Sequence, residues 1–237
     1  TWAAKLQSVI VGGSIVEISG DTLFNSLLCI ERDGTLKATY RKRHLFGFQS
    51  KEQQILTKGE SAVVADTQFG KIGFSTCYDL RFPEHYREMI DQGAELFVVV
   101  SAWPEARLDH WRLFNQVRAV ENQCWLVSCN CAGLQCGNRY AGHSMAVSPS
   151  GVIAAEAGGK ACVQWIDIDM KEVERARNAF PALRDRKTNS VSGYQTGGVM
   201  MKILITGFEP IRQFYDINPS WEAVKKLPDK INEVEIV

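Results

Sequence analysis

The chain has 237 residues, of which 45% are hydrophobic and 23% are charged, as is typical of a globular protein with a sizeable core. Lysine and arginine together number 27, and so do aspartate and glutamate, so the formal net charge is zero. This balance argues against a nucleic acid or an anionic membrane surface as a partner. No apolar run approaches the roughly 18 residues that a transmembrane helix needs, so we predict no membrane span.

The seven cysteines are an odd number, which a set of intramolecular disulfides would not use up. Four of them cluster in the sequence, at Cys124, Cys129, Cys131 and Cys136, but none forms the Cys-x-x-Cys pair that zinc sites commonly use. We therefore predict buried free thiols in a reducing, cytoplasmic setting, with neither a metal nor another cofactor.

The first hundred or so residues are rich in segments that favour β-strands. We predict strands over Ser8–Val16, Ser26–Ile30, Thr35–Tyr40 and Lys71–Ser75. The turn residues Asp33 and Gly34 between two of these segments favour a hairpin. A continuously apolar run over Glu95–Val100 indicates a strand that is covered on both faces.

Two segments favour helices. One runs over Glu84–Gln92 and ends at Gly93, and the other runs over Arg107–Asn122. In the second helix the spacing of Leu113, Val117 and Val120 places all three on one face. Further strands are predicted over Cys124–Cys131, Ser144–Val147 and Val163–Ile168. Because strands alternate with helices and antiparallel hairpins are mixed in, we predict a layered α/β fold.

The composition changes near Gly193–Val199, a stretch suited to a linker. The segment Met200–Pro210 then looks like the beginning of another protein, with an apolar strand followed by a glycine turn. Ser220 could cap a helix that runs to Lys226. The tail is shorter than the roughly 40 residues that a domain needs to fold unaided, so we expect it to pack on another part of the chain or to remain loose.

Cys77 follows the predicted strand Lys71–Ser75 and precedes a segment compatible with a helix. A thiol at the end of a strand and close to a helix N-terminus has the surroundings of a nucleophile. Taken alone, a cysteine is more often a small buried hydrophobic residue. The nucleophile interpretation therefore depends on residues elsewhere in the sequence.

Amide hydrolysis needs, besides a nucleophile, a proton shuttle and positive charge at the developing oxyanion. The basic cluster Arg41–His44 comes at the end of a predicted strand, where Lys42 could reach into a cleft. Glu52 follows in the next segment. Both could also be solvated surface residues, which is the commoner role of such charged runs.

Together these segments resemble the nitrilase, or carbon–nitrogen hydrolase, superfamily. Its pattern combines a lysine in Arg-Lys-x-His-Leu-Phe, a later glutamate, and a cysteine in Cys-Tyr-Asp-x-Arg-Phe-Pro-Glu. The resemblance extends from Ser8 to Lys187 and rests on these segments, in order: Arg41–Phe46, Glu52, Cys77–Glu84, Ser101–Pro104, His110–Trp111, Arg118–Gln123 and Gly142–Met145. Within the superfamily the chain is most similar to the ω-amidases, which hydrolyse the terminal amides of small 2-oxo acids such as 2-oxoglutaramate.

The resemblance implies a four-layer αββα sandwich, commonly assembled as a homodimer, with a small amide as its substrate. It implies that Cys77 attacks the amide carbon to form a thioester, that ammonia leaves, and that water then frees the acid. Lys42 and the backbone N–H of Tyr78 would stabilise the oxyanion. Glu52 would orient Lys42 and the substrate, and Trp103 would belong to the substrate-binding side.

One part of the family pattern has no match here. The family's general base is a glutamate in a region that precedes the part matching Ser8. We therefore expect the fold to lack the N-terminal strand and helix and its catalysis to be impaired. Glu17 lies nearby in sequence but in a different motif. The alternative is a catalytically inactive nitrilase-fold subunit that serves binding or assembly.

The tail carries a second resemblance. Met201–Pro210 and Ile217–Val224 are similar to the start of a pyroglutamyl peptidase, whose catalytic Cys and His would lie far downstream. We therefore divide the chain into a carbon–nitrogen hydrolase domain (1–192), a linker (193–200) and a truncated pyroglutamyl-peptidase-like segment (201–237). We expect no peptidase activity from this segment alone.

Overall fold

The computed structural model describes residues 1–135, 137–187, 200–206, 230–231 and 234–235, the last three ranges by their backbone only. The α-helices are α1 (Trp2–Leu6), α2 (Glu52–Ile55), α3 (Pro83–Asp91), α4 (Leu108–Asn122) and α5 (Lys171–Ala179), with 3₁₀ turns η1 (Cys77–Arg81) and η2 (Glu105–Arg107). The strands of the two main layers are β1 (Ile10–Ser19), β2 (Thr22–Ile30), β3 (Leu36–Arg41), β4 (Val64–Thr67), β5 (Gly70–Thr76), β6 (Leu96–Ser101), β7 (Trp125–Asn130), β10 (Met145–Val147), β11 (Ile153–Glu156), β12 (Val163–Asp169) and β13 (Met200–Thr206). Two small hairpins are β8 (Ala132–Gln135) with β9 (Asn138–Ala141), and β14 (Lys230–Ile231) with β15 (Val234–Glu235).

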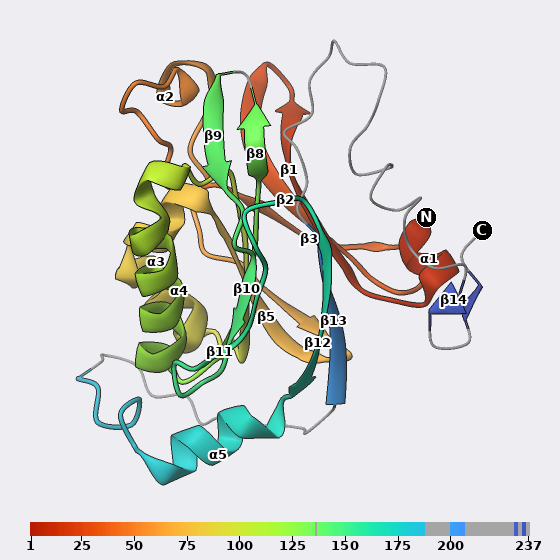
Figure 1. Cartoon of the computed structure of the whole chain (residues 1–237), viewed down its shortest axis with the longest axis vertical. Coiled ribbons are helices and arrows are strands. Elements are labelled where there is room, and N and C mark those ends of the chain that lie inside the picture. Colours follow the sequence, from red (N-terminus) through yellow and green to blue (C-terminus); the bar gives the residue numbers. More distant parts are fainter. Residues whose placement is uncertain (136, 188–199, 207–229, 232–233, 236–237) are drawn as a thin grey trace.

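The larger sheet has six strands in the order β11-β10-β7-β6-β5-β4 (Figure 1). Its three central strands, β5, β6 and β7, run parallel, and the outer strands pair antiparallel. The second β layer contains the antiparallel sheet β1-β2-β3 and the antiparallel pair β12-β13. Helices connect the parallel strands, since α3 links β5 to β6 and α4 links β6 to β7.

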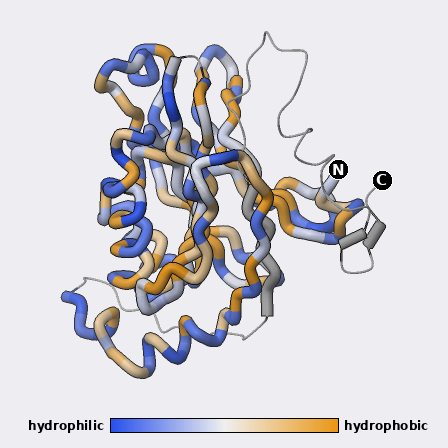
Figure 2. The backbone as a smooth tube through the Cα atoms, in the orientation of Figure 1, coloured by the Kyte–Doolittle hydropathy of each residue, from blue (hydrophilic) through white to orange (hydrophobic). Residues whose placement is uncertain are grey.

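Two hydrophobic cores lie on the two faces of the six-stranded sheet. One core fills the space between the two β layers, and the other lies under α3 and α4. Strand β6 contributes to both, because Leu96 and Val100 point into the first core while Phe97 and Val99 point into the second. This confirms the predicted strand that is covered on both faces. Figure 2 shows hydrophobic and hydrophilic residues alternating along helices α4 and α5.

The helices α3 and α4 pack on the outer face of the six-stranded sheet (Figure 1). A Cβ atom at Gly73 would stand 2.6 Å from the sulfur of Met89, so the glycine allows α3 to approach β5 closely. Helix α4 buries Trp111 and Ala119 against the sheet. Leu113 and Val120 share a face, as predicted, but this face is outward: 56% and 45% of these two residues are exposed.

The described residues form three of the four predicted layers, namely the α3–α4 layer and the two β layers. The predicted helices agree with α3 and α4 to within one residue at each end. These layers and helices confirm the predicted mixed α/β architecture. On β1 the side chains of Val16 and Ile18 are exposed to solvent.

The strand predicted at the start of the tail forms β13, which pairs with β12 from Val163 opposite Thr206 to Asp169 opposite Met200. The tail thus packs on the hydrolase-like part of the chain, one of the two possibilities that its length left open. The helix predicted over Ser220–Lys226 and nearly all of the predicted linker lie outside the described residues.

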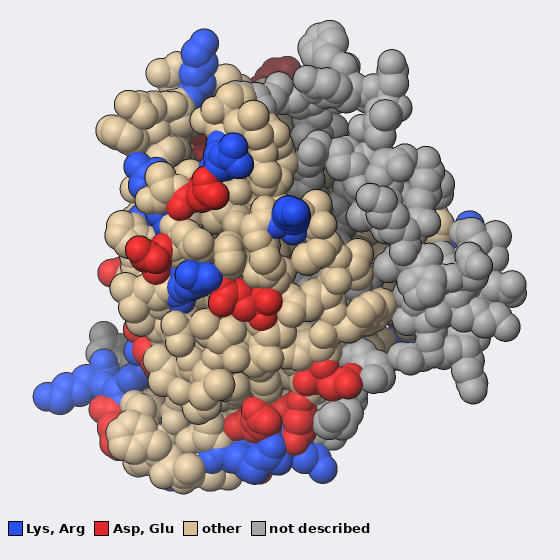
Figure 3. Space-filling view, viewed as in Figure 1, with Lys and Arg blue, Asp and Glu red and all other residues tan. Residues whose placement is uncertain are grey.

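Within the described ranges no helix is long and apolar enough to span a membrane. On the face shown in Figure 3, acidic and basic side chains are interspersed among uncharged ones. This face therefore carries no extended surface of one charge.

Candidate active site

A cavity of about 630 Å³ opens at the carboxyl ends of the parallel strands. In parallel sheets these ends are where ligands usually bind. Its wall includes all five residues singled out from the sequence: Lys42, Glu52, Cys77, Tyr78 and Trp103. Lys42 and Glu52 come from the layer of β1–β3, whereas the other three follow strands of the six-stranded sheet. The cavity therefore lies where the two layers meet.

The Lys42 side chain is almost completely buried, yet it carries a charge. It follows the last residue of β3, and its backbone N–H donates to the carbonyl of Asn25 on β2 at 2.8 Å. Its ammonium group donates to both carboxylate oxygens of Glu52, at 2.9 and 2.8 Å. Only 4% of the Lys42 side chain is exposed, so this carboxylate is what compensates the lost hydration of the ammonium group.

The two oxygens of the Glu52 carboxylate accept four hydrogen bonds in all. Besides Lys42, it accepts from the side-chain amide of Asn25 at 2.9 Å and from the backbone N–H of Phe46 at 2.7 Å. These four bonds fix the first turn of α2 against β2 and the segment after β3. The arrangement suits a residue that orients Lys42 better than one that moves protons.

Cys77 begins the 3₁₀ turn η1 directly after β5, at the strand end predicted from the sequence. Its φ of 49° lies in the left-handed region, which is uncommon for a residue with a side chain. Such strain persists only where the surroundings hold it, and it occurs often at active sites. The helix that follows, α3, begins only at Pro83, so the cysteine sits on a 3₁₀ turn and not on the first turn of an α-helix.

One part of the cavity wall is aromatic and cationic. The guanidinium of Arg81 lies 4.9 Å from the ring centre of Trp103 and 5.0 Å from that of Phe114. The Trp103 indole N–H donates to the backbone carbonyl of Arg107 at 2.8 Å. Burial and the nearby Arg107 lower the pKa of Arg81. In the described part of the chain neither arginine forms an ion pair with a carboxylate, although both line the cavity.

Glu17 does not line the cavity and is paired with other residues. Its carboxylate accepts from Arg41 and from the hydroxyl of Ser26, which lowers its pKa from 4.5 to about 2. Among the described residues that line the cavity, Glu52 is the only carboxylate. The cavity wall therefore offers no second carboxylate for proton transfer within these residues.

The cysteines that cluster in sequence separate in space. Cys129 and Cys131 line the cavity, whereas Cys124 is buried on the helix side, where its thiol donates to the carbonyl of Ala94 at 3.2 Å. Burial raises the pKa of Cys124 to about 11. Within the described ranges no three His, Cys, Asp or Glu residues converge as metal ligands would.

Sequence reasoning did not single out several residues of the site. Asn25 lies within a strand and reaches Glu52 only through the register of β2 against β3. Arg81 stands in the Cys77–Glu84 segment, and its place in the motif Cys-Tyr-Asp-x-Arg-Phe-Pro-Glu is the signal that could have found it. Arg107 and Asn25 carry no local pattern that would mark them.

A model of the family described as carbon-nitrogen hydrolase matches residues 1–178. The chain belongs to the carbon–nitrogen hydrolase family. The resemblance to this superfamily seen in the sequence is thereby confirmed. The matched residues end before β13, so this strand lies outside the family match.

Three relatives illustrate the similarity. The chain is 35% identical over 171 residues to a 2-oxoglutaramate amidase of Paenarthrobacter nicotinovorans, covering 70% of this chain and 58% of that protein. It is 35% identical to the crystal structure of Saccharomyces cerevisiae Nit3, with a TM-score of 0.73 over 78% of this chain and 69% of that one. It is 26% identical to an amidase variant from Nesterenkonia sp. AN1 in which acrylamide has added to the active site cysteine, with a TM-score of 0.62 and coverage of 67% and 62%. The chain thus spans little more than half the length of the Paenarthrobacter relative.

The buried Lys42–Glu52 pair generates a prediction about stability. Replacing Glu52 by alanine leaves the Lys42 ammonium group buried without its partner, which typically costs about 3–5 kcal/mol of unfolding free energy. We expect the double variant Lys42→Met/Glu52→Ala to recover much of this loss, because no buried charge then remains. Urea unfolding of the three proteins checks this, and an additive loss in the double variant would contradict it.

Proposed function

We propose that the chain hydrolyses the terminal amide of a small 2-oxo acid to the acid and ammonia, as an ω-amidase does. The observation that carries this proposal is that Cys77 and the buried Lys42–Glu52 pair line one cavity in a carbon–nitrogen hydrolase fold. Relatives named 2-oxoglutaramate amidase and omega-amidase support the substrate class.

In the proposed reaction the sulfur of Cys77 attacks the amide carbon, and the negative charge moves to the carbonyl oxygen. Lys42 and the backbone N–H of Tyr78 stabilise this oxyanion. The C–N bond then breaks, the nitrogen takes up the thiol proton and leaves as ammonia, and a thioester remains. Water cleaves the thioester to the carboxylic acid and restores the thiol. Acrylamide addition at the cysteine of the Nesterenkonia relative supports a nucleophilic role for Cys77.

The cations on the aromatic side of the cavity favour an anionic substrate. Glu52 already neutralises Lys42, so Arg81 and Arg107 are the charges left to meet a ligand within the described wall. A 2-oxo acid amide carries a carboxylate at the end away from its amide. We propose that Arg81 binds this carboxylate, with Trp103 holding the guanidinium in place.

Among the described residues of the site, no carboxylate is well suited to transfer protons during the reaction. The four hydrogen bonds that Glu52 accepts leave it poorly suited to shuttle protons. Missing general acid–base help typically costs about 10²- to 10⁴-fold in rate. We therefore propose that the enzyme is slow when the described residues alone form its active site.

Ammonia release from 2-oxoglutaramate tests the proposed activity. We expect release above that of the matched variant Cys77→Ala, which keeps the cavity but removes the nucleophile. Equal release by the two proteins would refute the hydrolase proposal and leave the inactive binding or assembly subunit as the reading of the fold.

Substrate choice provides a separate test of Arg81. We expect Arg81→Gln to raise KM for 2-oxoglutaramate about tenfold or more, because a charge-assisted hydrogen bond contributes about 1.5–3 kcal/mol. A neutral amide such as butyramide lacks the carboxylate, so its KM is expected to stay unchanged. Steady-state kinetics with both substrates measure this, and an equal change for both would count against carboxylate binding.

We also propose that the chain forms a homodimer through the outward face of α4. Leu113 and Val120 expose apolar surface there at helical spacing, which a second copy could bury. We expect Leu113→Glu to shift the protein to the monomer in size-exclusion chromatography with light scattering. A wild-type protein that is already monomeric would contradict the proposal.

The cysteines support a cytoplasmic location. None of the six cysteines in the described part of the chain is in a disulfide, as expected in a reducing compartment. We therefore propose that the protein resides in the cytoplasm, which fractionation of the cells that produce it can check.

A further inference from the structure

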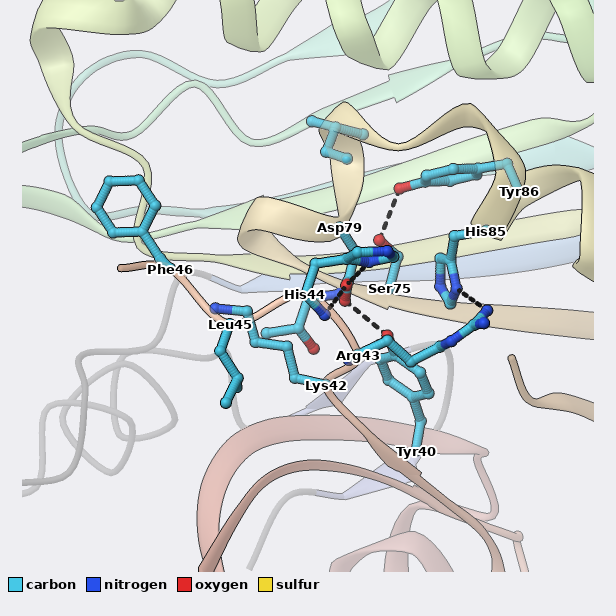
Figure 4. A network of polar contacts seen from close by, with 12 residues as sticks. Tyr40, Lys42, Arg43, His44, Leu45, Phe46, Ser75, Asp79, His85 and Tyr86 are labelled. Atoms are coloured by element: carbon cyan, nitrogen blue, oxygen red, sulfur yellow. Dashed lines mark hydrogen bonds and ion pairs between the residues drawn. The ribbon is translucent and has the colours of Figure 1, made fainter. Parts of the chain in front are cut away.

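One buried carboxylate joins the two segments that carry Lys42 and Cys77 (Figure 4). Asp79, on the turn η1, is completely buried. Its Oδ1 accepts from the backbone N–H of His44 at 2.9 Å and from the His44 ring Nδ1 at 2.7 Å. Its Oδ2 accepts from the hydroxyl of Tyr40 at 2.6 Å and from the backbone N–H of Thr76 at 2.9 Å. Both oxygens thus make two hydrogen bonds each.

Asp79 and its partners flank both key residues in the sequence. Tyr40 and His44 stand two residues before and two residues after Lys42. Thr76 and Asp79 enclose Cys77 and Tyr78. A shift of Asp79 would therefore move the lysine and the cysteine relative to each other, although Asp79 itself does not line the cavity.

The charge and tautomer of this network follow from its donors. Burial alone would raise the pKa of Asp79, but the hydrogen bonds from His44 and Tyr40 and the neighbouring His85 hold it below its usual value. An ionised carboxylate only accepts hydrogen bonds, so His44 carries its proton on Nδ1. The His44 ring is stacked on Phe82, with ring centres 3.8 Å apart and planes inclined by 9°, which fixes its direction.

We propose that Asp79 is a positioning residue: through Tyr40 and His44 it sets the oxyanion-stabilising Lys42 at a fixed place relative to the nucleophile Cys77. This inference rests on the proposed function, and it adds a residue that touches neither substrate nor reacting atoms. Because a misplacement of about 1 Å can cost about a hundredfold in rate, such a link acts on kcat more than on KM.

The molecule contains a matched control for this link. Tyr86 is also completely buried, and its hydroxyl forms a 2.6 Å hydrogen bond with Ser75, at the end of the same strand β5 (Figure 4). This pair joins α3 to β5 and does not involve the Lys42 segment. Tyr40→Phe and Tyr86→Phe therefore remove the same chemical group from equally buried sites, but only the first removes a bond to Asp79.

Steady-state kinetics of these two variants with 2-oxoglutaramate test the proposal, at a temperature where both are folded. We expect Tyr40→Phe to lower kcat about ten- to a hundredfold with KM within about twofold of the wild type. We expect Tyr86→Phe to keep kcat and KM within about twofold of the wild type, even if its melting temperature falls as far as that of Tyr40→Phe. An equal loss of kcat in the two variants would overturn the proposal.

His44 offers a second pair of variants with a built-in rescue. The amide of His44→Asn can donate to Asp79 from about the position of Nδ1, whereas His44→Leu has no donor there. We expect the asparagine variant to keep most of the wild-type kcat and the leucine variant to lose it. Equal activities would contradict a role through the Asp79 bond, because both variants lose the stacking on Phe82.

Alkylation of Cys77 by iodoacetamide separates the failure of this proposal from the failure of the proposed function. If the wild-type chain releases no ammonia, the hydrolase proposal fails, but the alkylation rate still reports how the thiol is held. We then expect alkylation to change severalfold in Tyr40→Phe and to match the wild type in Tyr86→Phe. Unchanged rates in both variants would overturn the positioning role.

Discussion

The Lys42 ammonium group is buried, and the arrangement of the whole site follows from this burial. An ammonium group taken out of water is tolerated only with a partner that replaces its hydration, and Glu52 supplies both carboxylate oxygens. The Glu52 carboxylate in turn accepts hydrogen bonds from the Asn25 side chain and from the backbone N–H of Phe46. The pair therefore ties the first turn of α2, strand β2 and the segment after β3 into one wall of the cavity.

The two walls of the cavity come from different layers, and this explains why contacts between them matter. The layer of β1–β3 carries the cation, and the parallel strands carry the thiol and the aromatic side. Sheets that pack face to face contact each other through the side chains of their inner faces, so a polar contact that reaches both layers fixes one wall relative to the other. The Asp79 carboxylate is such a contact, because its donors lie on both layers.

A strand of the tail, β13, pairs with one edge of β12. Strand β13 lies outside the family match, yet its seven residues pair with β12 along their whole length. An unpaired strand edge presents backbone donors and acceptors that invite association with other chains. The β12–β13 pairing satisfies one edge of β12 within the same molecule. A segment that resembles the start of another enzyme thus serves here as part of a sheet.

Local patterns in the sequence predict part of this fold and of its cavity wall. Helical spacing predicted α4, a continuous apolar run predicted β6, and ordered motifs identified the family and the five residues Lys42, Glu52, Cys77, Tyr78 and Trp103 that line the cavity. Motifs suffice there because each spans a few neighbouring residues whose spacing is fixed along the chain.

Which distant residues meet depends on how the strands and helices pack. The four hydrogen bonds of Asp79, the outward direction of Leu113 and Val120, and the place of Arg107 beside Trp103 have no local signature. Periodicity tells which residues of a helix share a face but not whether that face meets a sheet or solvent. A buried polar group likewise finds its partners through strand register and layer packing, which bring together residues that are far apart in the sequence.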